Sequence, residues 1–183
     1  MEMACLDFLN SEFRDFRGRW MKDYLQEPEW LAEFLARWNL QIDAAPETAP
    51  LEELEALRAL LRRMVEAIPT RHPAQEDIAA LNTVLHYAPA TMQLTWNGQE
   101  FNLEALPLKK DWHWVMAEIA GSFADLLVHH DILRVKVCEN PYCRWIFYDE
   151  SKSRTKRWCT NNKCANLWKV RRFRERHKEE IHP

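Results

Sequence analysis

Two cysteine pairs with the same spacing decide the C-terminal fold of this chain: Cys138-Glu-Asn-Pro-Tyr-Cys143 and Cys159-Thr-Asn-Asn-Lys-Cys164. Each pair encloses four residues, and fifteen residues separate the two pairs. Four thiolates delivered as two short knuckles match the all-sulfur tetrahedral coordination of a closed zinc site, which leaves no open position for a substrate. The spacing therefore predicts one structural Zn(II), held by Cys138, Cys143, Cys159 and Cys164, that stabilises a fold.

Two other uses of these cysteines stay open. The four thiols could form two disulfides, but we find no secretory signal pattern, which favours reduced thiols and a cytoplasmic location. His177 could replace one cysteine as a ligand, although a histidine on a partly apolar helix face is more often a packing residue. We expect four thiolate ligands and one metal.

The charge of the chain is distributed unevenly around this cysteine cluster. Between Cys138 and Lys178 there are twelve basic and four acidic residues, a net charge of +8, whereas the whole chain carries -3. The remainder must therefore be strongly acidic, at -11. A small, strongly basic module attracts polyanions, and phosphate neutralisation is the commonest use of such charge. Duplex DNA is the leading partner, and docking of the basic surface on an acidic protein is the alternative.

The cysteine stretch carries a resemblance to a known family. The residues that carry it are Cys138-Glu-Asn-Pro-Tyr-Cys143, Trp145, Phe147, Asp149, Ser151, Lys156-Arg157-Trp158-Cys159, and Cys164-Ala165-Asn166-Leu167 with the basic stretch that follows. This order is similar to the CGNR zinc finger of bacterial regulators. The opening Leu6-Asp7-Phe8-Leu9-Asn10-Ser11 resembles the start of the ABATE domain that precedes this finger. The resemblance implies a stress-induced transcription regulator with a helical N-terminal domain and a zinc-dependent DNA-binding element.

The chain departs from the family motif at two positions. Ala165 and Leu167 stand where the motif Cys-Gly-Asn-Arg has its glycine and arginine. Alanine is favourable in a helix by about 1 kcal/mol over glycine unless the backbone needs a positive φ. Loss of the arginine matters more, because a planar group with five donors becomes an apolar side chain.

A basic helix is expected to begin near Cys164 and run to about residue 180. Asn161 and Asn162 are suitable N-cap residues, and the run contains no glycine or proline. A stripe of Asn166, Val170, Phe173 and His177 is expected to pack on the zinc knuckle. The residues expected to contact nucleic acid are Arg154, Lys156, Arg157, Lys169, Arg171, Arg172, Arg174 and Arg176. The aromatic residues between these charges are expected to form a small core of the finger. If they were exposed, they could stack on RNA bases, and RNA binding would be a third possible function.

Upstream of the finger, hydrophobic periodicity predicts helices and one hairpin. Helices are expected at 28–38, 51–68, 74–87 and 111–131, with a turn-rich connector at 44–50. Residues 92–96 and 101–103 alternate around Asn97-Gly98, which is a strong hairpin signal. A strand is expected at 132–137. The fold class is therefore mainly α: a multihelical N-terminal domain with an inserted β-hairpin, followed by a small four-cysteine module that ends in a basic helix.

Catalysis and membrane insertion are both disfavoured. No catalytic triad, paired-carboxylate cleft or glycine-rich nucleotide loop stands out, so we expect no enzyme activity. Asp7 and Asn10 are expected to cap or brace the first helix, and His129-His130-Asp131 is a weak candidate for a second metal site. No apolar run approaches the roughly 20 residues that cross a bilayer.

These observations predict a two-part regulator. Residues 1–131 form a helical ABATE-like domain, and residues 132–183 form a CGNR-like zinc finger with a basic C-terminal helix. The finger is expected to bind duplex DNA with zinc as its cofactor. Docking on an acidic protein and RNA binding remain alternatives, and a homodimer through the helical domain stays open.

Overall fold

A computed structural model describes residues 1–43, 48–70 and 72–181, with the backbone alone at 175 and 178–181. The predicted connector at 44–50 lies partly outside these residues, as does the side chain of Lys178. The helices of the first domain are α1 (Ala4–Leu9), α2 (Pro28–Arg37), α3 (Leu51–Ala67), α4 (Gln75–Leu85) and α5 (Trp112–His129). The helical segments predicted from periodicity are thereby confirmed, with small differences at their ends.

Local signals explain where these helices begin. Pro28 occupies the first turn of α2, where its missing N–H costs nothing. The side chain of Asp111 caps α5 by accepting a hydrogen bond from the backbone N–H of Trp114, at 3.1 Å. Glu52 and Glu53 lie in the first turn of α3, where carboxylates stabilise the positive end of the helix dipole.

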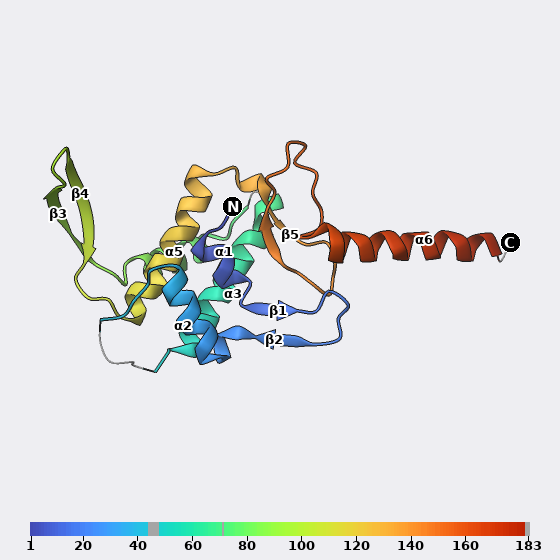
Figure 1. Cartoon of the computed structure of the whole chain (residues 1–183), viewed down its shortest axis with the longest axis horizontal. Coiled ribbons are helices and arrows are strands. Elements are labelled where there is room, and N and C mark those ends of the chain that lie inside the picture. The colour runs from blue at the N-terminus through green and yellow to red at the C-terminus, as the bar shows by residue number, and fades with distance from the viewer. Residues whose placement is uncertain (44–47, 71, 182–183) are drawn as a thin grey trace.

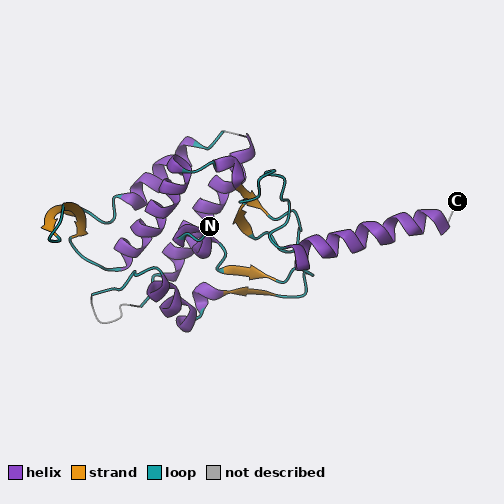
Figure 2. Cartoon of the chain, turned by 45° about the horizontal axis from the view of Figure 1, so that its top comes forward, coloured by secondary structure: helices purple, strands orange, loops and turns teal. Residues whose placement is uncertain are grey.

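The β-strands form three separate hairpins at the edges of the helical body (Figure 2). They pair β1 (Glu12–Arg14) with β2 (Met21–Asp23), β3 (Ala90–Trp96) with β4 (Phe101–Pro107), and β5 (Val135–Val137) with β6 (Ile146–Tyr148), all antiparallel. The β3–β4 hairpin confirms the prediction from Asn97-Gly98: Gly98 adopts φ +98°, and the Asn97 side chain accepts from two backbone N–H groups of the turn. The β1–β2 hairpin was not predicted.

One hydrophobic core joins the helices to the third hairpin. Its fully buried members include Phe8 of α1, Leu61 of α3 and Phe123 of α5. Val135 and Ile146 from β5 and β6 are buried in the same cluster. The expected strand at 132–137 is shorter than predicted, because residues 132–134 form a 3-10 turn first. The division of the chain between residues 131 and 132 stays a prediction.

A second, smaller cluster surrounds the cysteines. Phe147 is buried there with Cys138, Cys143 and Cys164, and Trp145 and Trp158 pack around them. These aromatic residues thus form the expected miniature core. After this cluster, a π-helical turn (Asn161–Ala165) leads into α6 (Asn166–Ile181), which extends away from the rest of the molecule (Figure 1). The mainly α fold class, with a hairpin in its first part and a four-cysteine module ending in a helix, is confirmed.

Candidate metal centre and nucleic-acid interface

Four local elements bring the cysteines together. Cys138 follows β5, Cys143 precedes β6, Cys159 ends the loop after β6, and Cys164 lies in the π-helical turn. Their sulfur atoms all lie within 4.8 Å of one another. The Sγ–Sγ distance is 3.7 Å from Cys143 to Cys159 and 3.8 Å from Cys159 to Cys164. A tetrahedral zinc with Zn–S bonds of about 2.3 Å separates its sulfurs by roughly 3.8 Å.

The four cysteines therefore form a single zinc site. The described residues contain no other cluster of potential metal ligands. None of the five cysteines forms a disulfide, so the disulfide alternative is wrong. His177 is not a ligand, because its ring contacts Phe173 on the exposed part of α6. At the candidate second site, His129, His130 and Asp131 are not gathered into a ligand cluster among the described residues, and Asp131 pairs with Arg154 at 2.9 Å instead.

The chemistry of the thiols calls for a cation between them. Hydrogen bonds from Cys143 and then Cys159 stabilise one thiolate and lower the pKa of Cys138 to about 2. The same contact with Cys138 raises the pKa of Cys159 to about 12, and it raises the pKa of Cys143 strongly. Without a cation one thiolate thus keeps its neighbours protonated. Bound Zn(II) would supply the positive charge that lets all four ionise.

Asn140 fixes the first knuckle from inside. Its side chain is buried, and its Nδ2 donates to the Sγ of Cys164 at 3.3 Å and to the backbone oxygen of Phe16 at 2.7 Å. Its Oδ1 accepts from the backbone N–H of Tyr142. One amide therefore connects a zinc ligand, the knuckle and the β1–β2 loop, and outer contacts of this kind orient metal ligands. Its position between two cysteines and before a proline was the only signal in the sequence.

The β1–β2 loop also sets how closely the knuckle can approach. Gly18 has φ +76°, and a Cβ at that position would lie 2.4 Å from the ring of Tyr142. The guanidinium of Arg171 lies 5.2 Å from the centroid of the same ring. The first turns of α6 are thus in contact with the knuckle through Tyr142.

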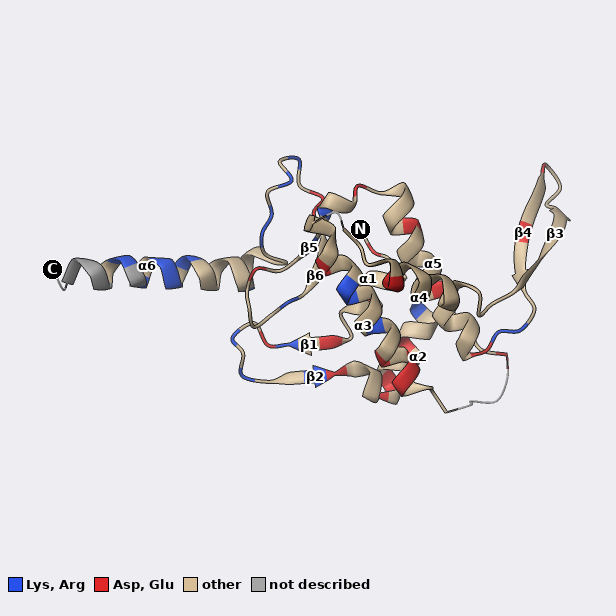
Figure 3. Ribbon diagram, turned by 180° about the vertical axis from the view of Figure 1, so that it is seen from behind, with Lys and Arg blue, Asp and Glu red and all other residues tan. Residues whose placement is uncertain are grey.

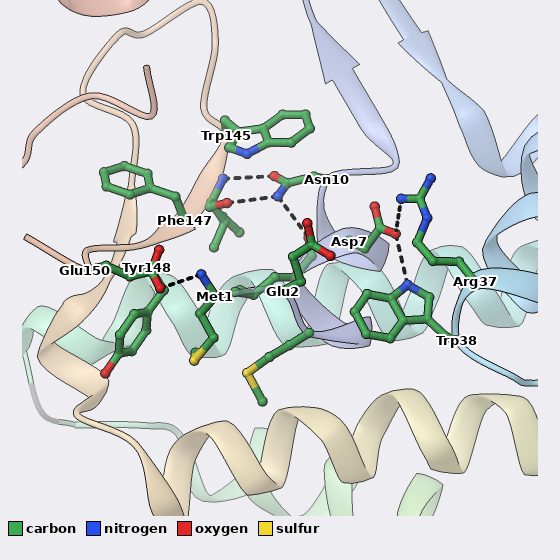
Figure 4. Close-up of a pocket in the computed structure, with 13 residues that line it drawn as sticks. Met1, Glu2, Asp7, Asn10, Arg37, Trp38, Trp145, Phe147, Tyr148 and Glu150 are labelled. Atoms are coloured by element: carbon green, nitrogen blue, oxygen red, sulfur yellow. Dashed lines mark hydrogen bonds and ion pairs between the residues drawn. The ribbon is translucent and has the colours of Figure 1, made fainter. Parts of the chain in front are cut away.

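Asn10 joins the helical body to the finger (Figure 4). Its Nδ2 donates to the carbonyl of Ile146 at 2.8 Å, and its Oδ1 accepts from the N–H of Ile146 at 2.9 Å. The amide therefore pairs with β6 as a neighbouring strand would. Nδ2 also donates to the carbonyl of Leu6 in α1. The expected bracing role of Asn10 is confirmed, and it extends to a residue 136 positions away.

A cavity of about 260 Å³ lies beside this junction (Figure 4). Asp7 borders it, and one of its carboxylate oxygens accepts from Arg37 Nη1 and from Trp38 Nε1, both at 2.9 Å. Asp7 thus braces α1 against α2, as expected. The polar groups of Asp7 and Asn10 are used by the protein itself.

The predicted contact residues of the loop after β6 have partners within the protein. Arg154 pairs with Asp131 at 2.9 Å, and Arg157 contacts both carboxylate oxygens of Glu139 at 2.8 and 2.7 Å. The ammonium of Lys156 lies over the ring of Phe147. These three predicted contact residues therefore already have intramolecular partners.

Buried Asp149 organises the same loop. Burial alone would raise the pKa of its carboxyl, but hydrogen bonds from Lys136, Ser151 and the backbone of Lys156 outweigh burial and lower that pKa. Lys136 Nζ also donates to the carbonyls of Arg154 and Lys156. Lys136 was not singled out from the sequence, where an isolated lysine in a strand gives no signal of such a role.

Helix α6 presents the remaining basic residues differently. Lys169, Arg172, Arg174 and Arg176 are exposed, and among the described residues no acidic side chain pairs with them. Figure 3 shows these positive charges along a helix that stands clear of the acidic body. Among the side chains that the structure describes, the predicted contact residues thus divide into loop arginines with acidic partners and helix cations without them.

The expectation that one stripe of α6 packs on the knuckle is wrong. Val170 and Phe173 are 39% and 54% exposed, and Asn166 and His177 are exposed as well. The reason is that α6 points away from the rest of the molecule, which leaves these side chains uncovered (Figure 1). The start also differs, because Thr160 is the N-cap of the π-helical turn and provides no side-chain hydrogen bond.

The two departures from the family motif lie at this start. Ala165 is buried, has no positive φ and donates its N–H to the carbonyl of Thr160 at 3.1 Å. Alanine therefore fits where the motif has glycine, as expected. Leu167 lies half-buried in the first turn of α6.

Comparison with known proteins agrees with this geometry. Residues 2–130 match the ABATE family, described as "Putative stress-induced transcription regulator", and residues 134–177 match the CGNR zinc finger. No curated protein matches the chain. Among the described residues, no helix has the length and apolar character that crossing a membrane requires. Because the first match spans more than half of its length, this chain belongs to the ABATE family, and a CGNR zinc finger forms its C-terminal part.

Proposed function

We propose that this protein is a bacterial transcription regulator that acts in the cytoplasm and binds duplex DNA through α6. The observation that carries the proposal is a contrast between the two basic segments. Arg154 and Arg157 of the loop after β6 are paired with Asp131 and Glu139, whereas Lys169, Arg172, Arg174 and Arg176 have no acidic partner among the described residues. Unpaired cations on one helix are suited to phosphate contacts that release counterions.

The shape of α6 also supports this function. Its 16 residues span roughly 24 Å at 1.5 Å per residue. A helix of this kind fits the major groove, which is about 12 Å wide, when no other part of the protein covers it. Most of α6 stands away from the body (Figure 1). The four cysteines act at its base: bound zinc supplies the crosslink that fixes the direction of the helix.

The residues proposed to contact phosphates are those of α6. They are Lys169, Arg172, Arg174 and Arg176, together with Arg171, whose guanidinium would have to leave the ring of Tyr142 to do so. Arg154, Lys156 and Arg157 take a secondary place, because a contact with DNA would have to compete with their intramolecular partners. The family description is of a regulator and not of an enzyme. We also propose that the regulator works as a homodimer formed through its N-terminal domain.

The test is a fluorescence-anisotropy titration of zinc-loaded protein with duplex DNA at several salt concentrations. Four or five simultaneous phosphate contacts predict that log affinity falls with log salt at a slope of about -3.6 to -4.5. Competition with single-stranded RNA tests the RNA-binding alternative, and competition with an acidic polypeptide tests docking on an acidic protein. A flat salt dependence, or binding that excess duplex DNA does not displace, would contradict the proposal.

A further inference from the structure

The β3–β4 hairpin has one face that is entirely apolar. The register pairs Met92 with Ala105, Leu94 with Leu103 and Trp96 with Phe101, so these six side chains lie on the same face. The pairs that alternate with them place polar residues, including Gln93 opposite Glu104 and Thr95 opposite Asn102, on the other face. Such a pattern is typical of a sheet that packs on a partner through one face.

No part of the described chain covers this face. Leu94 is 63% exposed, Phe101 is 70% exposed, and Met92, Trp96 and Leu103 are exposed as well. The hairpin extends from the body at the end opposite α6 (Figure 1). A two-stranded hairpin is at best marginally stable in water without something to pack against. The face therefore calls for an occupant outside its own chain.

The charge of the face suits a second copy of the same chain. Residues 90–107 contain two charged side chains, Glu100 in the turn and Glu104 on the polar face. Two copies brought together through their apolar faces therefore place no like charges in contact. A face that is apolar and neutral can pack against a second copy of itself, as an interface across a two-fold axis requires.

The area is also sufficient. The five large side chains of the face present roughly 600 Å² of apolar surface, which is at the upper end of the largest patches that monomeric proteins expose. Two such faces packed together would bury roughly 1,200 Å², which reaches the range of specific protein interfaces.

We infer that the β3–β4 hairpin is a dimerisation arm, and that two copies pack these apolar faces against each other across a two-fold axis. Leu94 and Leu103, in the middle of the hairpin, lie closest to the axis. The inference deepens the homodimer part of the proposed function by naming its surface, and it does not depend on DNA binding.

The experiment measures the mass of zinc-loaded protein without DNA, by light scattering or sedimentation at tens of micromolar. The wild-type chain should have twice its mass of 21.9 kDa. Leu94→Lys places a charge on the apolar face and should give a monomer. Gln93→Lys, one residue away on the polar face and opposite Glu104, is the matched control and should stay dimeric. Unchanged helical circular dichroism and zinc content show that both variants fold.

A mixing experiment tests the two-fold geometry. Leu94→Glu should also be monomeric, but an equimolar mixture with Leu94→Lys should recover the dimer, because opposite charges then meet at the axis. A monomeric wild-type protein, equal masses for Leu94→Lys and Gln93→Lys, or a mixture that stays monomeric would overturn the inference. The DNA titration is read independently, so failure of DNA binding leaves these results intact.

Discussion

The β3–β4 hairpin and helix α6 both extend from the body of the molecule, at opposite ends (Figure 1), but they expose different surfaces. The hairpin presents apolar side chains such as Leu94 and Phe101, with no charge among them. Helix α6 presents Arg172, Arg174 and other cations. A neutral apolar face gains free energy by excluding water, and a row of cations gains it by displacing counterions. The two projections are therefore suited to different partners.

They also differ in what holds them in place. The turn of the hairpin is fixed by Asn97 and Gly98 within the hairpin itself. The base of α6 is fixed by Cys164, by Asn140 and by the contact of Arg171 with Tyr142. The hairpin needs no metal, whereas the direction of α6 depends on one.

Loss of zinc should separate the two projections most clearly. Cys159→Ser, or chelation of the metal, removes one crosslink from the base of α6, so DNA binding should be lost and the zinc content should fall from one per chain to near zero. Dimerisation through the hairpin and most of the helical circular dichroism should remain. Cys5→Ser is the control, because Cys5 is buried away from the cluster. DNA binding that survives without zinc would show that α6 binds DNA without the metal crosslink at its base.

Removing cations from α6 should have the next largest effect. Arg172→Ala, Arg174→Ala and Arg176→Ala together should weaken DNA binding by about a hundred- to a thousandfold near 0.1 M salt and reduce the salt slope by up to about 2.7, since each phosphate contact contributes about 0.9. Anisotropy titrations at several salt concentrations measure both changes.

The matched control is Arg154→Ala with Arg157→Ala in the loop after β6. Because these side chains are paired with Asp131 and Glu139, the double variant should change affinity by less than about tenfold. Equal losses for the two sets would mean that the internal pairs open on DNA and that the loop contributes as much as α6.

Asn10→Ala should weaken the attachment of the finger to the body. The N–H and carbonyl of buried Ile146 lose their partners, which should cost about 2 to 4 kcal/mol of the free energy of unfolding. Thermal denaturation should then show a Tm lowered by roughly 5 to 15 °C. Asn82→Ala, at an exposed position of α4, should leave Tm nearly unchanged. If Asn10→Ala and Asn82→Ala have the same Tm, the pairing of Asn10 with Ile146 contributes little to the free energy of unfolding.

Leu167→Arg restores the arginine of the family motif, and among these variants we expect it to have the smallest effect in free energy. One charge-assisted contact is worth about 1 to 3 kcal/mol, so DNA binding should tighten about five- to more than a hundredfold. Asp149 is a poor alternative partner, because it is buried and already accepts from Lys136, Ser151 and Lys156. Leu167→Gln serves as the uncharged control. A raised Tm with unchanged affinity would instead place the new arginine against the protein.

The sequence predicted what is encoded locally. The zinc site follows from cysteine spacing, and the β3–β4 hairpin follows from alternation around Asn97-Gly98. Periodicity also grouped Val170 with Phe173 on one face of α6, but it could not tell whether anything covers that face. Burial depends on the direction in which a helix leaves the body, and no short pattern encodes that direction.

Interactions between distant segments were beyond prediction for the same reason. The pairing of Asn10 with Ile146 spans 136 positions, and the contact of Asn140 with Phe16 spans 124. The β1–β2 hairpin has strands of only three residues, too short for a periodic signal. Its loop meets the finger through the contact of Phe16 with Asn140, which no local pattern encodes, so its role is visible in the structure alone.

Cys164 lies two residues before α6 begins, so a small rotation at the metal site moves the free end of the helix as a rigid lever. A lever of roughly 24 Å turned by about 10° at its base moves its free end by about 4 Å. That displacement is comparable to the spacing of successive base pairs, about 3.4 Å along the duplex. Coordination of the four sulfurs to one zinc would therefore limit how far the outer cations of α6 can shift from the phosphates that they meet.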